Sequence, residues 1–85
     1  MVLWLREGEG AALRLGVVTS KKVSRRAVDR NLARRRLREA FRTHRDELTG
    51  AVDVVLIGRR NILDATQAEV EAEFLRLADK AGLLK

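Results

Sequence analysis

The sequence contains no cysteine, no proline and no tyrosine, and its only aromatic residues are one tryptophan and two phenylalanines. Without cysteine the chain forms no disulfide and offers no thiolate to a metal ion. No apolar run approaches the roughly 18 residues that a membrane-spanning helix requires. The opening MVLWLREGEG also lacks the basic lead and long apolar stretch of a signal peptide. These absences favour a cytoplasmic protein that neither spans a membrane nor binds a metal.

The chain also lacks the features that divide longer proteins into parts. It has no serine- or glycine-rich linker and no internal repeat, so residues 1–85 are expected to form a single domain. A hydrophobic content of 46% is enough for a core and argues against wholesale disorder. A domain of this size buries only about 60% of its unfolded surface, so we expect its stability to be marginal.

Acidic residues are scarce in one segment, residues 21–45, which reads KKVSRRAVDRNLARRRLREAFRTHR. This segment holds eleven of the 18 lysines and arginines of the chain but only two of its 12 acidic residues, Asp29 and Glu39. Its formal charge is therefore +9, whereas the rest of the chain carries −3 and the whole chain +6. Such a concentration of positive charge points to a polyanionic partner, nucleic acid first and an anionic membrane surface second.

Hydrophobic patterns predict three strands. Residues 2–6 (VLWLR) and 13–20 (LRLGVVTS) are short strand patterns, and residues 51–59 (AVDVVLIGR) are apolar and β-branched enough for a strand inside the sheet. Gly8 and Gly10 lie between the first two strands. Because glycine readily takes positive φ, they predict a hairpin turn that would pair these strands.

Two helices are predicted, over residues 26–48 and about 65–82. At helical spacing the first has an apolar arc, made of Ala33, Leu37, Ala40, Phe41, His44 and Leu48. An adjacent arc is polar and mostly basic, and contains Asn31, Arg34, Arg35, Arg38, Arg42 and Arg45. Gly50 and Gly82 are predicted stop signals, and the TQAE sequence of residues 66–69 predicts a capping box. The order is β-β-α-β-α, with helices packed on a sheet.

The sequence offers no constellation of residues typical of catalysis. His44, the only histidine, falls on the apolar arc and is interpreted as structural rather than as a general base. Asp53 and Asp64 stand alone and are interpreted as capping or surface-pairing residues. No P-loop, dinucleotide fingerprint or metal-ligand spacing occurs. Trp4 and Phe74 are expected in the core, the alternative for Trp4 being an exposed sheet face on which bases stack.

The first helix carries electrostatic costs that the chain itself does not offset. Residues 34–36 are three consecutive arginines, and like-charged pairs four residues apart, such as Arg30/Arg34 and Arg34/Arg38, cost about 0.2–0.5 kcal/mol each. A merely solvated helix face would instead mix charges of both signs. We therefore expect an external polyanion, since the planar arginine fork binds phosphate through two parallel hydrogen bonds.

The segment TSKKVSRRAVDRNLARRRLREAF resembles the protein component of bacterial ribonuclease P. That family carries a strand ending in SKK, followed by A-V-x-R-N-R running into KR-x-x-RE-x-F. The matching residues are Ser20, Lys21, Lys22, Ala27, Val28, Arg30, Asn31, Arg34, Arg35, Arg38, Glu39 and Phe41. The VDVVLIGRR strand and a terminal helix at the family's spacing extend the similarity to nearly the whole chain.

The chain departs from the family pattern in three places. Leu32 stands where the family has the second arginine of the RNR triplet, which removes one expected phosphate contact, and Ser24 stands where it usually has glycine, which should alter the loop before the helix. The family's N-terminal basic helix, which precedes the first strand, has no counterpart in the chain. In the family that helix forms one wall of the cleft that holds the 5′ leader of precursor tRNA. The resemblance therefore supports binding of the RNA subunit more strongly than binding of the leader.

The resemblance implies an α+β fold, a two-layer α/β sandwich with a left-handed β-α-β crossover. This handedness would be unusual, because about 98% of such crossovers are right-handed. It also implies a non-catalytic protein subunit of the endoribonuclease that removes the 5′ leader of precursor tRNA. The RNA subunit and its Mg²⁺ would carry the chemistry, and the protein itself would bind no cofactor. The implied partners are ribonuclease P RNA and precursor tRNA, with one protein monomer in a 1:1 complex with the RNA.

The charged helix and the resemblance together predict the RNA-binding residues, which are Lys21, Lys22, Arg26, Arg30, Asn31, Arg34, Arg35 and Arg38. The cations would bind phosphates, Asn31 would hydrogen-bond a 2′-hydroxyl or a base, and Glu39 would orient a neighbouring arginine. Trp4 and Val18 are predicted to line the leader-binding sheet face. Three alternatives stay open, namely a ribosome-associated or other accessory RNA-binding protein, a DNA-binding module with the basic helix in a major groove, and a basic amphipathic helix on an anionic membrane.

Overall fold

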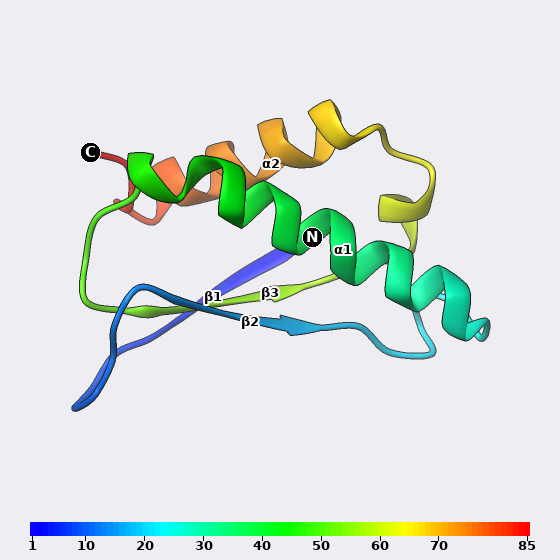
Figure 1. Cartoon of the computed structure of the whole chain (residues 1–85), viewed down its shortest axis with the longest axis horizontal. Coiled ribbons are helices and arrows are strands. Elements are labelled where there is room, and N and C mark those ends of the chain that lie inside the picture. Colours follow the sequence, from blue (N-terminus) through cyan, green and yellow to red (C-terminus); the bar gives the residue numbers. More distant parts are fainter.

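The chain folds into three strands and two long helices in the predicted order β-β-α-β-α. The computed structural model describes every residue from Met1 to Lys85. The elements are β1 (Val2–Arg6), β2 (Arg14–Val18), α1 (Ala27–His44), β3 (Asp53–Ile57) and α2 (Gln67–Lys80), with short 3₁₀ helices η1 (Arg45–Glu47) and η2 (Arg60–Leu63). The strands form one sheet, and both long helices lie on the same face of it (Figure 1). Neither helix has the length and apolar character needed to cross a membrane.

Strand β3 is the central strand of the sheet, between β1 and β2. It pairs antiparallel with β1 and parallel with β2, so the predicted hairpin between the first two strands is wrong. The physical reason is the composition of β3, in which Val54 and Leu56 are fully buried. A strand this apolar belongs in the interior of a sheet, with hydrogen bonds along both of its edges. The segment after β1 therefore passes the end of β3, turning at Gly8 and Gly10, whose φ values are +138° and +80°.

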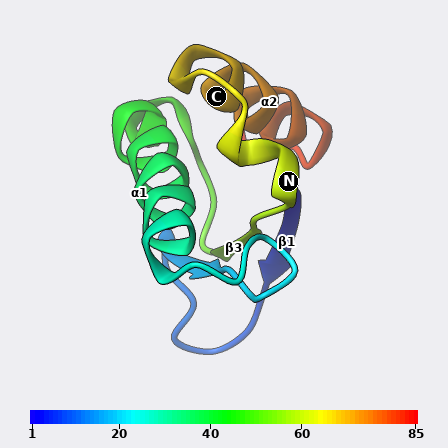
Figure 2. The ribbon, with the colours of Figure 1, turned by 90° about the vertical axis from the view of Figure 1, so that its right-hand side faces the viewer.

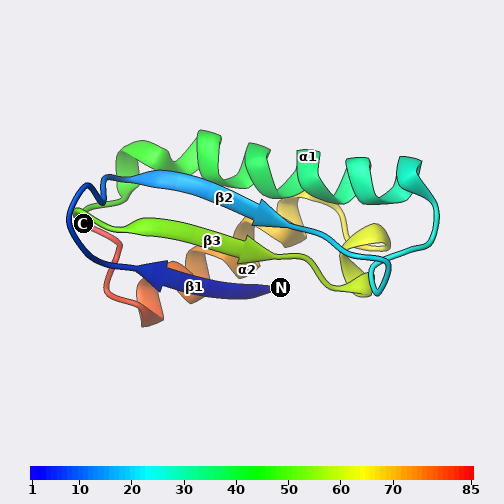
Figure 3. The ribbon, with the colours of Figure 1, turned by 90° about the horizontal axis from the view of Figure 1, so that it is seen from below.

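The connection from β2 through α1 to β3 is left-handed. Figure 3 views the sheet from the side opposite the helices, and there β2 and β3 both run from left to right, with β2 above β3 and α1 behind the sheet. The chain leaves β2 at its right-hand end, runs back behind the sheet along α1 and enters β3 below β2. This path turns in the left-handed sense. The handedness implied by the family resemblance is confirmed, although about 98% of such connections are right-handed.

The core lies between the sheet and the two helices. Figure 2 shows α1 above the β2 side of the sheet and α2 above the β1 side. The rings of Phe41 and Phe74 meet edge to face where the helices pack together, with centroids 6.3 Å apart and planes at 71°. The predicted apolar arc of the first helix is confirmed for Ala33, Leu37, Ala40 and Phe41, which are buried on α1. The buried residues of α2 are Val70, Phe74 and Ala78.

Trp4 lies outside the core, with 61% of its surface exposed. Successive side chains of a strand point to opposite faces. Leu3 and Leu5 pack against the core, so Trp4 between them faces away from the helices. The expected core position of Trp4 is therefore wrong and its alternative, the exposed sheet face, is confirmed. Phe74, in contrast, is fully buried as predicted.

The first helix ends earlier than predicted. Helix α1 stops at His44 instead of residue 48, because the chain tightens into η1 and Leu48 is already extended, forming a bridge with Leu84. Gly50 lies in the loop before β3 with a φ of +119°, and so does not terminate the helix.

The ends of α2 follow the prediction. The Thr66 hydroxyl accepts a hydrogen bond from the Glu69 backbone N–H, and the Glu69 carboxylate accepts one from the Thr66 backbone N–H. These reciprocal bonds are the predicted capping box. At the other end Gly82 has a φ of +75°, and its N–H and that of Leu83 donate to the carbonyls of Asp79 and Ala78, which closes the last turn.

Candidate nucleic-acid interface

Helix α1 carries its basic residues on the surfaces that the sheet leaves uncovered. Its core face consists of Ala33, Leu37, Ala40 and Phe41. Of the predicted RNA-binding residues, six are exposed (Lys21, Lys22, Arg26, Asn31, Arg35 and Arg38), and Arg30 and Arg34 are half-buried. The structure therefore brings the predicted set together on one stretch, from the loop after β2 along most of α1.

Little of this positive charge is neutralised by the protein's own carboxylates. Among the predicted cations only Arg26 has a carboxylate within ion-pair distance, where its Nε lies 4.0 Å from the oxygen of Asp29. Farther along α1, Arg42 is paired with Glu39 through two hydrogen bonds. The remaining cations of the predicted set face solvent or neutral oxygen atoms, so the repulsion between them is not relieved within the protein.

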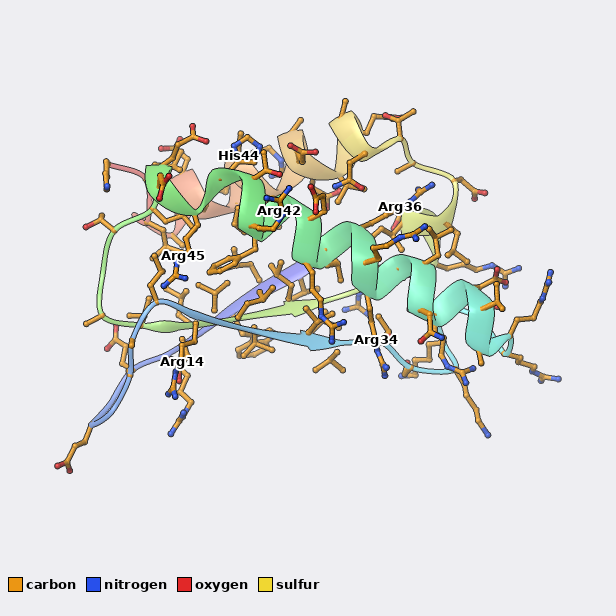
Figure 4. All side chains as sticks on the ribbon, viewed as in Figure 1. Arg14, Arg34, Arg36, Arg42, His44 and Arg45 are labelled. Carbon is orange, nitrogen blue, oxygen red and sulfur yellow. The ribbon has the colours of Figure 1, made fainter.

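Arg30 and Arg34 are held in place by neutral acceptors. Arg34 donates from Nε to the Thr19 hydroxyl at 2.9 Å, and Figure 4 shows its side chain extending from α1 toward the sheet. Arg30 donates from Nη1 to the carbonyl oxygens of Ser24 and Arg25, at 3.0 and 2.9 Å. Both side chains are thereby ordered while each keeps its full positive charge.

Ser24 organises the start of α1. Its hydroxyl accepts a hydrogen bond from the Arg26 backbone N–H at 3.1 Å and donates one to the Asp29 carboxylate at 2.9 Å. A glycine at this position would make neither bond. That Ser24 changes the loop before the helix stays a prediction, and these two contacts are the ones that a glycine would lack.

Two arginines of the basic segment, Arg36 on α1 and Arg45 at the start of η1, have structural contacts instead. Arg36 donates from Nη1 to the carbonyl oxygens of Ile62, at 2.8 Å, and Ala65, which fixes α1 against the segment that leads into α2. Arg45, placed on the basic arc by its spacing, donates to the Leu13 carbonyl at 3.1 Å. Figure 4 shows these side chains pointing toward different parts of the molecule from Arg34.

The loop after β2 adds two lysines to the interface. Val23 is buried and anchors this loop, whose turn is closed by bonds from the Val23 N–H to the Ser20 carbonyl and from the Lys22 N–H to the Ser20 hydroxyl. Lys21 and Lys22 are consequently both exposed.

Arg59 and Arg60 lie beside this loop and were missed from the sequence. A shallow pocket joins the two segments and is lined by Ser20, Lys22, Ile57, Gly58, Arg59 and Arg60. The link is the parallel pairing of β2 with β3, which brings both carboxyl ends to the same edge of the sheet. The GRR sequence of residues 58–60, after a predicted strand, was a signal for additional basic residues in the interface. That these arginines lie beside the loop after β2 could be known only from the pairing of β2 with β3.

The outer face of the sheet consists of three rows of side chains set by the strand register. One row contains Val2, Ile57 and Val18, and the next contains Trp4, Val55 and Gly16. Trp4 and Val18 therefore share one exposed apolar face, on opposite edge strands. Gly16 has no side chain, so the surface is open on the β2 side of Val55, across this residue from Trp4.

The third row is charged and centres on Asp53. Its carboxylate accepts hydrogen bonds from Arg6 at 2.8 Å, from Arg14 at 3.1 Å through two nitrogens, and from the Ala12 backbone N–H at 3.2 Å. The bonds from Arg14 and then from Ala12 lower the pKa of Asp53, against a smaller opposing effect of desolvation. The predicted pairing role of Asp53 is thus observed, and it ties together all three strands.

His44, the last residue of α1, contacts both η1 and α2. Its Nδ1 contacts the carboxylate of Glu47 and its Nε2 lies 2.9 Å from that of Glu71 on α2, while 17% of the side chain is exposed. The hydrogen bond with Glu47 is the main cause that raises the pKa of His44, opposed by desolvation and reinforced by Glu71. Both ring nitrogens are engaged, which agrees with the structural role predicted for this residue. The structure contains no group of three or more His, Asp and Glu side chains arranged to hold a metal ion.

Sequence comparisons connect this fold and charge distribution to a known family. The family profile described as Ribonuclease P matches residues 1–82. The ribonuclease P protein component of Thioalkalivibrio sulfidiphilus is 42% identical over 74 residues, which cover 87% of this chain and 61% of that protein. The corresponding protein of Xanthomonas axonopodis pv. citri is 44% identical over 71 residues, or 84% of this chain and 48% of that one. The chain thus spans about half to three fifths of the length of these relatives.

Solved structures show the same fold. The ribonuclease P protein of Staphylococcus aureus superposes with a TM-score of 0.78 at 25% identity, covering 98% of this chain and 75% of that one. The ribonuclease P protein of Thermotoga maritima gives a TM-score of 0.78 at 26% identity, covering 92% and 74%. Profile, sequence relatives and structures agree, and the chain belongs to the family of ribonuclease P protein components.

Proposed function

We propose that this chain acts as the RNA-binding protein subunit of a ribonuclease P. The observation that supports this role most strongly is the α1 cation cluster, which we define as Lys21, Lys22, Arg26, Arg30, Arg34, Arg35 and Arg38. Only one of these seven residues lies within ion-pair distance of a carboxylate. Phosphates of a folded RNA would supply the missing countercharge, and release of their counterions would drive association.

The role of the protein in this proposal is electrostatic. The RNA subunit, with Mg²⁺, would hydrolyse the phosphodiester bond that joins the 5′ leader to precursor tRNA. Two RNA molecules that come together repel each other through their phosphates. The α1 cation cluster would reduce this repulsion, so that the complex forms at a lower Mg²⁺ concentration. Arg30 and Arg34 would contribute with little loss of side-chain freedom, because both are already ordered by neutral acceptors.

The outer face of the sheet is the proposed binding surface for the single-stranded 5′ leader. Non-specific binding of single strands combines aromatic stacking with a basic path for the backbone. Trp4 and Val18 supply the exposed apolar surface, and Arg59 and Arg60 lie near the end of the strand that separates them. A leader nucleotide would stack on the indole while its phosphates follow the basic residues. One protein molecule for each RNA subunit is the expected stoichiometry.

Reconstitution tests this function. The protein is added to a bacterial ribonuclease P RNA at a Mg²⁺ concentration too low for the RNA alone, and 5′ cleavage of precursor tRNA is followed. We expect cleavage to accelerate with the wild-type protein and not with the Arg34→Glu/Arg38→Glu variant. A matched control is Arg76→Glu on α2, which changes an exposed arginine for which the structure shows no ion pair. Failure of the wild-type protein to accelerate cleavage, or full activity of the double variant, would contradict the proposal.

The same protein distinguishes the alternatives. A DNA-binding module would prefer a DNA duplex over ribonuclease P RNA in competition at equal salt. A membrane-surface protein would float with anionic vesicles and show no preference among RNAs. Another RNA-binding accessory protein would bind the RNA subunit without accelerating cleavage.

A further inference from the structure

Helix α1 has an apolar groove on its outer face, within the α1 cation cluster. The groove is lined by Val28, Asn31, Leu32 and Arg35, has a volume of about 450 Å³ and opens to solvent. Val28 precedes Asn31, Leu32 and Arg35 by three, four and seven positions, so all three side chains are neighbours of Val28 on that side of the helix.

The two apolar residues of this groove contribute little to the fold. Val28 is 68% exposed, and the other exposed large apolar residues, Trp4 and Val18, both lie on the sheet face. Leu32 is half-buried, yet it belongs neither to the buried core nor to the partly buried side chains that pack against the core. Core packing therefore does not account for a leucine and a valine among arginines.

Phosphate binding does not account for them either. A surface that bound only phosphates would gain from a cation at position 32, where the related pattern has arginine, and would gain nothing from leucine. The substitution removes one positive charge and provides an aliphatic surface next to the side chains of Asn31 and Arg35. Both of these are exposed and make no side-chain hydrogen bond within the protein.

We propose that this groove holds an unpaired nucleobase of the RNA that the α1 cation cluster binds. This inference rests on the proposed function and specifies what one part of the RNA-binding surface recognises. Val28 and Leu32 would contact the face of the base. The amide of Asn31, which both donates and accepts hydrogen bonds, would read its edge. Arg35 would bind the adjacent phosphate or stack on the exposed side of the ring.

The groove fits a nucleobase better than other apolar ligands. A protein partner would need roughly 800 Å² of surface on each side, far more than two aliphatic side chains provide, and a partner with its own cations would be repelled. A nucleobase is flat and apolar on its face, polar at its edge and attached to a negative charge. Those three properties match the aliphatic pair, the amide and the guanidinium in turn. RNA recognition at unpaired, unstacked positions follows the same chemistry.

Binding measurements with two RNA hairpins test the groove independently of cleavage. One hairpin is fully paired in its stem, and the other carries a single unpaired base in an otherwise identical stem. We expect wild-type protein to prefer the bulged hairpin and Val28→Ala/Leu32→Ala to lose about five- to tenfold in affinity for it, the low end of the range for single base contacts. The salt dependence of binding should not change in this variant, because no phosphate contact is removed. Affinity of the variant for the fully paired hairpin should match that of the wild type.

A second variant adds a test with the opposite sign. Leu32→Arg should steepen the log–log salt dependence by about one unit, since it adds one phosphate contact, and should reduce the preference for the bulged hairpin. The groove proposal would be overturned if wild-type protein bound both hairpins equally, or if both variants kept the wild-type preference. Thermal melting of each variant checks the fold, which we expect to be unchanged because Val28 is exposed and Leu32 lies outside the core.

These outcomes separate the groove from the proposed function. Acceleration of precursor tRNA cleavage without any preference for the bulged hairpin would reject the groove and leave the ribonuclease P role intact. A groove-dependent preference without acceleration of cleavage would support the groove and reject that role.

Discussion

Arg34 donates a hydrogen bond from Nε to the hydroxyl of Thr19 over 2.9 Å, which connects the middle of α1 to the residue that follows β2. The acceptor is neutral, so the guanidinium is positioned without losing its charge. A carboxylate at position 19 would also have oriented the arginine but would have cancelled much of its attraction for phosphate. This arrangement is what an anion-binding surface requires, because an ordered cation loses less side-chain entropy when its ligand binds.

Removal of single arginines from the α1 cation cluster should change the salt dependence of RNA binding. Each phosphate contact contributes about 0.7 to 0.9 to the slope of log K against log salt concentration. Arg34→Ala and Arg38→Ala should each reduce this slope by about one unit. The measurement is a titration of ribonuclease P RNA at several salt concentrations.

The matched control for these variants is Arg76→Ala. Arg76 is exposed on α2 and carries the same charge, so a general effect of net charge would appear in it as well. We expect its slope to equal that of the wild type. If Arg76→Ala lowered the slope as much as Arg34→Ala, binding would depend on total charge rather than on the α1 cation cluster.

Thr19→Val should weaken RNA binding without changing its salt dependence. Valine has nearly the shape of threonine but cannot accept the hydrogen bond from Arg34, so the cation remains while its orientation is lost. A typical protein hydrogen bond contributes about 0.5–1.5 kcal/mol, which corresponds to a loss of roughly two- to tenfold in affinity. The same RNA titrations measure both quantities. A reduced slope would show that Arg34 no longer reaches the phosphate at all.

Phe74→Ala should lower the stability of the protein, whereas Trp4→Ala should lower its binding of the 5′ leader. Phe74 is fully buried, and its truncation should cost about 3–5 kcal/mol of unfolding free energy. Trp4 is 61% exposed, so its truncation should change stability by no more than about 0.5 kcal/mol. Trp4→Ala should instead reduce the preference of the holoenzyme for precursor tRNA over mature tRNA, which binding to each RNA measures. An equal loss of affinity for both tRNAs would place the leader elsewhere.

The local features of this fold were predictable from the sequence, and the non-local pairing of strands was not. The capping box at Thr66 and Glu69 depends on residues three apart, and the buried face of α1 depends on helical spacing. Strand order depends on which edges meet after folding. Two glycines between short strands predicted a hairpin, but the burial of Val54 and Leu56 favours β3 at the centre of the sheet.

The candidate site was predictable to the same extent. The excess of positive charge follows from composition, and the helix that carries it follows from the spacing of apolar residues. Consecutive side chains on a helix point about 100° apart, so the three consecutive arginines face different surroundings. Contacts outside the helix then decide their roles. Arg35 faces solvent, whereas Arg36 donates to the carbonyls of Ile62 and Ala65, which lie more than twenty positions away in the sequence. Arg59 and Arg60 join the interface only through the parallel pairing of β2 with β3.

His44 should make the stability of the protein depend on pH above about 6.5, the ordinary pKa of histidine. Its pKa is raised from the ordinary value of 6.5 by hydrogen bonds with Glu47 and Glu71, which favour the protonated ring. Arg42 also interacts with Glu71 but is already paired with Glu39. An ionisable group whose pKa is higher in the folded than in the unfolded protein contributes its full stabilisation at pH values below its pKa in the unfolded chain. This stabilisation is lost as the pH rises through its pKa in the folded protein. The stabilisation from His44 should therefore be complete below about pH 6.5 and disappear at higher pH.

The comparison of wild type with His44→Gln isolates this effect. Glutamine can still hydrogen-bond the carboxylates but carries no titrating charge, and both proteins share every other titrating group, including the terminal amine bound to Glu73. Thermal melts between pH 5.5 and 9 should show the wild-type protein more stable at the acid end, with the difference in Tm shrinking steadily as pH rises. A difference that stayed constant across this range would mean that the ring acts through packing and neutral hydrogen bonds alone. A difference in Tm that grew with pH would mean that the fold prefers the neutral form of His44. In that case the carboxylates of Glu47 and Glu71 would not offset the cost of removing the charged ring from water.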